Sequence, residues 1–92
     1  MQFLTISRLL PGVSGDSLAV LGQQESQRAR TLYVEGHLRQ IWYRDDTSGA
    51  CLLWEADSED QVRNMLATLP FAKAGLLEIT IIPLRPYAGF GP

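Results

Sequence analysis

The stretch EGHLRQIWYR, residues 35–44, decides the fold, because the chain passes here from a helix into a strand. Gly36 is a typical helix stop, since glycine readily adopts the left-handed conformation that follows a helix. From residue 37 onward the side chains alternate between two unlike faces, with His37, Arg39, Ile41 and Tyr43 on one and Leu38, Gln40, Trp42 and Arg44 on the other. Alternation of this kind predicts a β-strand over residues 37–44.

The two faces of this strand are expected to have different surroundings. Leu38 and Trp42 would complete an apolar layer beneath the helices. Arg39 and Tyr43 are then expected on the opposite, uncovered face, because burying a guanidinium without a partner is costly.

Upstream, the sequence predicts a strand over residues 2–10 and a helix over residues 16–33. Pro11 and Gly12 end the strand, and the run SGDS at residues 14–17 offers side chains that cap helices. An apolar stripe at helical spacing follows, and Glu25 and Gly22 interrupt it. Its members are Leu18, Leu21, Ala29 and Leu32.

Downstream, the polar turn DDTSG at residues 45–49 joins the strand at 37–44 to another at 50–56, which makes a hairpin. Ser58 with Gln61 forms a capping box that begins a second helix, and Pro70 ends it. A loop at residues 71–75 then leads to a strand over residues 76–84, where Leu77, Ile79 and Ile81 alternate with Glu78 and Thr80.

The predicted order is therefore βαββαβ, which is the ferredoxin-like α+β arrangement, a four-stranded antiparallel sheet with two helices on one face. Residues 1–84 form this domain, and residues 85–92, RPYAGFGP, form a Pro/Gly-rich tail that could pack on a partner subunit.

The sheet of such a domain has one covered face and one open face. We expect the helices to cover Leu4, Ile6, Leu77, Ile79 and Ile81. The open face is expected to display Phe3, Thr5, Ser7, Glu78 and Thr80. A half-apolar open face on a 92-residue chain predicts association, so we expect a homodimer or a larger homo-oligomer.

Composition narrows the class of protein. The net charge is -2 and the bases are spread along the chain, which argues against nucleic-acid binding. We find no long apolar run and no leader, and the single cysteine, Cys51, reads as a small buried hydrophobe, so we expect a cytoplasmic protein without membrane attachment. Neither Asp45-Asp46 nor the acids at residues 57–60 form a convincing metal site, and we expect no cofactor.

Several of these residues form short motifs that resemble a known family. The pattern EGxxRxxW of Glu35, Gly36, Arg39 and Trp42, together with the step LPF at residues 69–71, resembles muconolactone Δ-isomerase and its relatives among the dimeric α+β-barrel proteins. The resemblance covers residues 17–84. It implies an oligomer of ferredoxin-like subunits and, in the founding members, migration of a double bond in an unsaturated lactone acid during aromatic catabolism. The segment AKAGLLEITIIPLRP is closer to small uncharacterised α+β-barrel proteins.

Such a reaction needs a proton carrier and a group that binds the substrate carboxylate. Arg39 is our candidate for the carboxylate, and Glu78 or His37 for the proton. Tyr43, Ser7 and Thr5 could donate hydrogen bonds to the substrate carbonyl.

Structural roles remain open for the same residues. Glu78 could pair with Arg39 or another arginine, His37 could be a surface residue, and Trp42 and Trp54 could be core or interface aromatics. A non-enzymatic small-molecule binder, a structural oligomer and a monooxygenase of the same barrel class are therefore alternatives to the isomerase.

Overall fold

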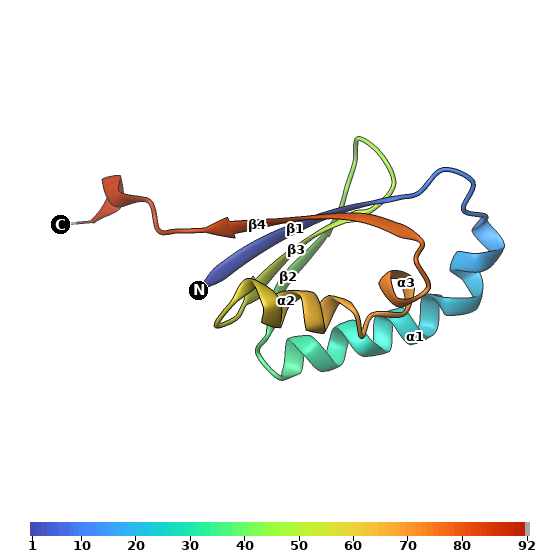
Figure 1. Cartoon of the computed structure of the whole chain (residues 1–92), viewed down its shortest axis with the longest axis horizontal. Coiled ribbons are helices and arrows are strands. Elements are labelled where there is room, and N and C mark those ends of the chain that lie inside the picture. Colours follow the sequence, from blue (N-terminus) through green and yellow to red (C-terminus); the bar gives the residue numbers. More distant parts are fainter. Residues whose placement is uncertain (92) are drawn as a thin grey trace.

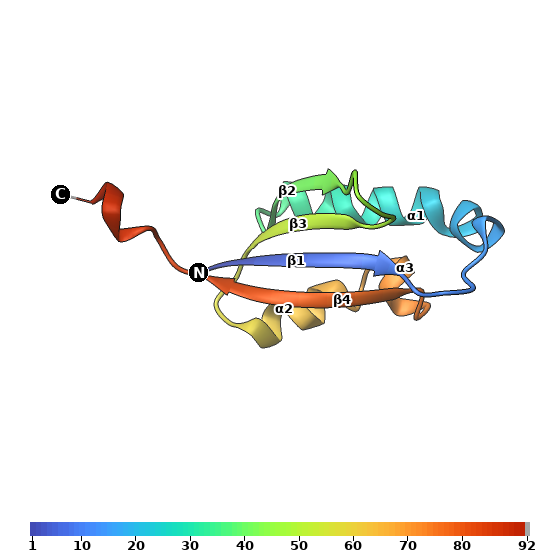
Figure 2. The same ribbon diagram turned by 90° about the horizontal axis from the view of Figure 1, so that it is seen from above.

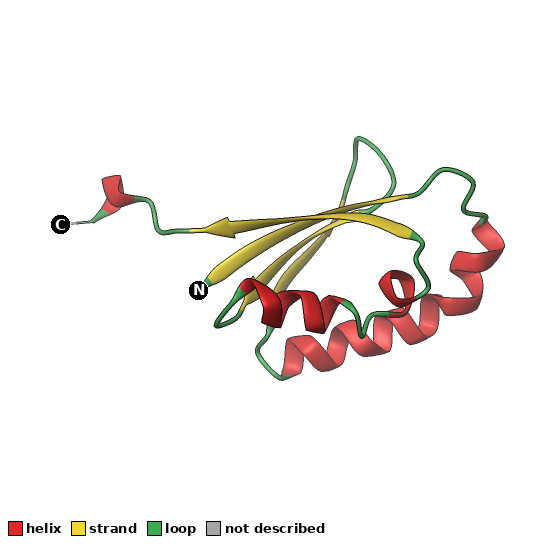
Figure 3. Cartoon of the chain, viewed as in Figure 1, coloured by secondary structure: helices red, strands yellow, loops and turns green. Residues whose placement is uncertain are grey.

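The computed structural model describes residues 1–91. Four strands and three α-helices form the body, and a short 3-10 helix lies in the C-terminal tail (Figures 1 and 3). In chain order they are β1 (Gln2–Leu9), α1 (Gly15–Val34), β2 (Leu38–Tyr43), β3 (Ala50–Glu55), α2 (Glu59–Leu66), α3 (Pro70–Lys73), β4 (Leu77–Leu84) and η1 (Ala88–Phe90).

The strands form one sheet in the order β2-β3-β1-β4, and all its pairings are antiparallel. The α-helices lie together on one side of this sheet, as Figures 1 and 2 show from two directions. Strand order and layering confirm the ferredoxin-like fold that the sequence predicts.

The predicted helix ends are confirmed in detail. Ser14 caps α1 by accepting a hydrogen bond from the Ser17 amide at 3.2 Å, and Ser58 caps α2 in the same way from the Gln61 amide at 3.1 Å. After α1 the chain turns at Gly36, whose φ of 86° is the left-handed conformation that glycine favours. The segment at 71–75 is not a plain loop as predicted, because Pro70 begins the short helix α3 there.

The covered face of β1 is the opposite of the predicted one. Phe3, Thr5 and Ser7 are buried under the helices, and Leu4 and Ile6 face the open side. Hydroxyl groups can be buried here because each has a partner. The indole Nε1 of Trp54 donates to Thr5 Oγ1 at 2.9 Å, and Ser7 Oγ bonds the backbone N–H and carbonyl of Ala50.

The other strands complete a continuous core. Trp54 and Leu38 are fully buried, and Ile79 and Ile81 of β4 pack against the core from the covered side, as predicted. Further large buried residues are Leu52 of β3, Leu32 of α1, Val62, Met65 and Leu66 of α2, and Leu69 between α2 and α3. The core thus fills the end of the sheet where α2 crosses it, and α1 continues beyond it (Figure 1).

A β-bulge in β2 corrects the predicted faces of that strand. Leu38 pairs with Trp54 and Gln40 with Leu53, so Arg39 is an extra residue on β2. Beyond the bulge the alternation is inverted relative to a regular strand. Tyr43 therefore lies on the covered side and Trp42 on the open side, the reverse of the prediction.

The open face of the sheet is apolar at its centre. Leu4 and Ile6 of β1 pair with Leu53 and Cys51 of β3, and Leu4 also pairs with Ile82 of β4. Trp42, 47% exposed, extends this surface on β2. We call these six side chains the open-face patch.

Candidate functional site

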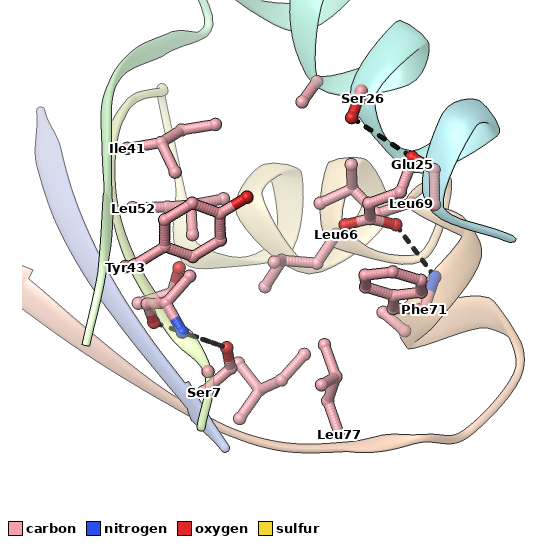
Figure 4. A pocket seen from close by; sticks show the side chains of 17 residues that line it. Ser7, Glu25, Ser26, Ile41, Tyr43, Leu52, Leu66, Leu69, Phe71 and Leu77 are labelled. Atoms are coloured by element: carbon pink, nitrogen blue, oxygen red, sulfur yellow. Dashed lines mark hydrogen bonds between the residues drawn. The ribbon is translucent and has the colours of Figure 1, made fainter. Parts of the chain in front are cut away.

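A cavity of about 370 Å³ lies between the covered face of the sheet and helices α1 and α3 (Figure 4). This volume falls within the range of small-molecule sites. Its walls are largely aliphatic, from Ile41, Leu52, Leu66, Leu69, Leu77 and Ile79. On α1 the facing positions are small, with Gly22 and Ala29 in the wall, so the helix leaves space where larger side chains would have filled the core.

Glu25 is the acidic group of this cavity. It projects from the middle of α1 and is half-buried among apolar side chains. Its Oε1 accepts a hydrogen bond from the Phe71 amide of α3 at 2.9 Å. Burial raises the pKa of the Glu25 carboxyl, and the Phe71 hydrogen bond opposes this effect only in part. A carboxyl whose pKa is raised toward neutrality is suited to exchanging protons.

Four hydroxyl groups also line the cavity, those of Thr5, Ser7, Ser26 and Tyr43. Thr5 and Ser7 are held by the core hydrogen bonds described above, and Ser26 Oγ donates to the Gly22 carbonyl at 3.1 Å. Tyr43 differs because it is 93% exposed and stands at the mouth of the cavity, across from Phe71 (Figure 4). Its phenol can therefore reach a ligand without breaking a core contact.

The structure separates the six residues that the sequence singles out. Tyr43, Ser7 and Thr5 line the cavity. Glu78 lies on the open face, where Arg8 Nη2 donates to its Oε2 at 2.8 Å and thereby lowers the pKa of the Glu78 carboxyl. His37 borders a smaller depression beside Met1 and Glu55 at the other end of the sheet.

Arg39 is exposed at the bulge of β2, away from the cavity lining. The proton-carrying roles of Glu78 and His37 and the anion-binding role of Arg39 therefore stay predictions that this geometry does not favour. The expected structural pairing of Glu78 with an arginine is confirmed, and the partner is Arg8.

Glu25 was not among the predicted site residues, although the sequence contains a signal for it. The apolar stripe of α1 passes through Leu21 and Ala29, and Glu25 occupies the position midway between them. A charged residue within a core-facing stripe is either destabilising or functional. The interruption at Glu25 was the observation that could have located the cavity.

Two further properties bear on function. Within residues 1–91, no three metal-ligating side chains come together in a way that could hold an ion. None of the helices in this range is both long enough and apolar enough to span a membrane. The expected cytoplasmic location stays a prediction.

Fold and site together define a small ferredoxin-like α+β protein with an apolar cavity that contains one carboxyl group. Comparison with family models assigns it further: residues 1–89 match the model of muconolactone delta-isomerase, and the chain belongs to that family. A search of curated proteins found no match.

Solved structures of the same fold include enzymes. A muconolactone isomerase structure is 19% identical, with a TM-score of 0.81 over 100% of this chain and 96% of that one. The 5-chloro-2-hydroxyhydroquinone dehydrochlorinase of Burkholderia phenoliruptrix, solved with 2,5-dihydroxybenzoquinone, is 24% identical, with a TM-score of 0.70 over 97% and 98%. The Mycobacterium tuberculosis protein Rv0793 is 14% identical, with a TM-score of 0.55 over 96% and 99%. At these identities the likeness shows the fold alone.

Proposed function

We propose that the protein is an isomerase that moves a double bond in a small unsaturated lactone or carboxylic acid by proton transfer, with Glu25 as the proton carrier. Membership of the muconolactone delta-isomerase family supports the reaction class. The observation that carries the proposal is the half-buried Glu25 carboxyl in a largely apolar cavity of ligand size. We also propose that the substrate comes from aromatic catabolism, as the family name suggests.

The chemistry needs one base and one hydrogen-bond donor. Glu25 would remove a proton from the carbon at the far end of the conjugated carbonyl system, and the electron pair would move toward the carbonyl oxygen to form a dienolate. The same carboxyl would return the proton to the carbon next to the carbonyl, so the double bond shifts and no other reactant is consumed. Tyr43, at the mouth, could donate a hydrogen bond to the developing oxyanion.

The geometry of Glu25 fits this role. Its Oε1 accepts a hydrogen bond from the Phe71 amide, whereas its Oε2 accepts none from residues 1–91 and points into the cavity (Figure 4). One oxygen thus fixes the carboxyl group, and the other is available for the proton. A fixed base avoids the entropic cost of ordering it in the transition state.

The test is turnover of unsaturated lactones by the wild type and by Glu25→Gln. We expect the wild type to isomerise at least one of muconolactone and β-angelica lactone, and Glu25→Gln to lose about a hundredfold or more in kcat/KM. Glu78→Gln makes the same charge change on the open face and should leave the rate unchanged. Loss of activity in Glu78→Gln and not in Glu25→Gln would instead support the role predicted from sequence.

A second candidate function is a non-enzymatic binder or structural oligomer, and the open-face patch favours it. The patch leaves Trp42 and Ile82, which is 36% exposed, uncovered in a single chain. We propose that a second copy covers it in a homodimer or a larger homo-oligomer. Full occupation of the cavity by a tightly bound compound without turnover would favour the binder over the isomerase.

The C-terminal tail supports oligomerisation too. Residues 85–91 leave the sheet and project away from the body (Figures 1 and 2), and Tyr87 and Phe90 stack edge to face with ring centroids 4.7 Å apart. Both aromatics are exposed. We propose that this tail packs on a neighbouring subunit.

A further inference from the structure

The lining of the cavity contains a single charged side chain, Glu25, as far as residues 1–91 are concerned. The other lining residues are apolar or carry hydroxyl groups. Five cations are next in sequence to lining residues, and none of them is part of the lining. Arg30 and Lys73 are exposed, and Arg8 pairs with Glu78. Arg28 Nε donates to Thr68 Oγ1 at 2.8 Å, and Arg44 bonds both carboxylate oxygens of Asp46 and the Ser7 carbonyl.

We infer from this lining that the substrate of the cavity is an uncharged ring compound, such as a lactone, enol or phenol without a carboxylate group. The inference rests on the proposed function and narrows it, because muconolactone itself is an anion. It concerns the chemical class of the ligand and holds for binding as well as for turnover.

The physical reason is the cost of burying a charge without a partner. A carboxylate ligand would lose water in a largely aliphatic cavity and would find no cation in the lining. It would also lie near the Glu25 carboxylate, and like charges repel strongly where water is scarce. A neutral ring loses far less hydration, and its own hydroxyl or carbonyl can bond Glu25 or Tyr43.

β-Angelica lactone is a matched neutral probe, since it carries a methyl group where muconolactone carries its carboxymethyl group. Isomerisation to α-angelica lactone breaks the C–H bond on the ring carbon that bears the methyl group and forms one on the carbon next to the carbonyl. The proton moves through Glu25 and no oxidant or reductant is needed. Comparing the two lactones therefore tests how the carboxylate of the ligand affects binding, while the reacting ring stays the same.

The experiment measures binding of both lactones to the full chain by calorimetry near neutral pH, with turnover followed separately. We expect β-angelica lactone to bind about tenfold tighter or more. Ser26→Lys places a cation at the cavity, whereas Gln27→Lys adds the same charge one residue along α1, where residue 27 is exposed and not part of the lining. Of these two lysine variants, only Ser26→Lys should improve muconolactone binding. Glu25→Gln should reduce the difference in binding affinity between the two lactones.

Equal or tighter binding of muconolactone by the wild type would overturn the inference. If the wild type bound muconolactone more tightly and Arg85→Gln did not, the cation that binds the carboxylate would come from the tail of another copy. Failure of the proposed function looks different: β-angelica lactone would bind in preference, but neither lactone would turn over. In that case the neutral ligand class stands and the isomerase does not.

Discussion

At the scale of single residues, the structure shows two carboxyl groups in opposite situations. Glu25 is half-buried and its pKa is raised by loss of water, whereas Glu78 is exposed and its pKa is lowered by Arg8. Their surroundings depend on which face of the sheet or helix each residue occupies. Sequence periodicity placed Glu78 on the open face correctly but did not show that this face lies away from the cavity.

These opposite shifts predict opposite effects of pH on stability. The folded protein binds a proton at Glu25 more tightly than the unfolded chain does, so the free energy of unfolding falls as pH rises from about 4.3, the usual glutamate value, through the raised pKa. Glu25→Gln removes this loss, and we expect it to be more stable than the wild type near neutral pH. Urea denaturation across the pH range measures the difference.

Glu78→Gln is the matched control for that measurement. The Arg8 hydrogen bond contributes stability above the unfolded pKa and loses it as pH falls through the lowered pKa. The wild type should therefore have a small advantage over Glu78→Gln at neutral pH that disappears in acid. A stabilisation of both variants at neutral pH would contradict the account given for Glu25.

At the scale of elements, local sequence predicted which segments form helices and strands, and long-range contacts decided the faces. The caps at Ser14 and Ser58 and the stop at Gly36 act within a few residues, so they could be identified from the sequence. The burial of Thr5 depends on Trp54, which lies 49 residues away and donates the hydrogen bond. The bulge at Arg39 had no signal in the alternation of β2, so Tyr43 was expected on the open face although it lies on the covered side.

The turn between β2 and β3 depends on a close contact at Gly49. Its φ is 120°, and a side chain there would overlap the backbone carbonyl of Ser7. We expect Gly49→Ala to cost about 3 kcal/mol or more, because backbone strain and a steric clash coincide. Gly12→Ala is the control, since Gly12 has a φ of 85° with nothing within 4 Å, and it should cost about 1 kcal/mol. Similar losses in thermal denaturation would show that the Ser7 contact is unimportant.

At the scale of the whole molecule, one chain has two unfinished features, the open-face patch and the projecting tail. Composition and length already predicted an association surface on this small domain. They did not identify its residues, because Leu4 and Ile6 were expected beneath the helices and Phe3 on the open side. In the structure the two faces of β1 are exchanged relative to the prediction, so the open-face patch is more apolar than the predicted open face. This strengthens the proposal of a homo-oligomer.

We expect Trp42→Lys and Ile82→Lys to weaken self-association by about tenfold or more, since each places a charge in the proposed contact. Val20→Lys changes an apolar residue on α1 that is 76% exposed and outside the patch, and it should have no effect. Sedimentation velocity over a range of concentrations measures the assembly. Unchanged association in both patch variants would exclude this face as the subunit contact.

The bulge in β2 also has an evolutionary consequence. Because Arg39 is one residue more than the regular ladder needs, loss of its single codon would restore strict alternation downstream while leaving Leu38 in the core. Ile41 and Tyr43 would stay on the covered side and Trp42 on the open side, because these residues already pair with β3 in a continuous register. Relatives that differ by this one deletion would therefore keep the chemistry of both surfaces and differ in the local bend and twist of this edge strand.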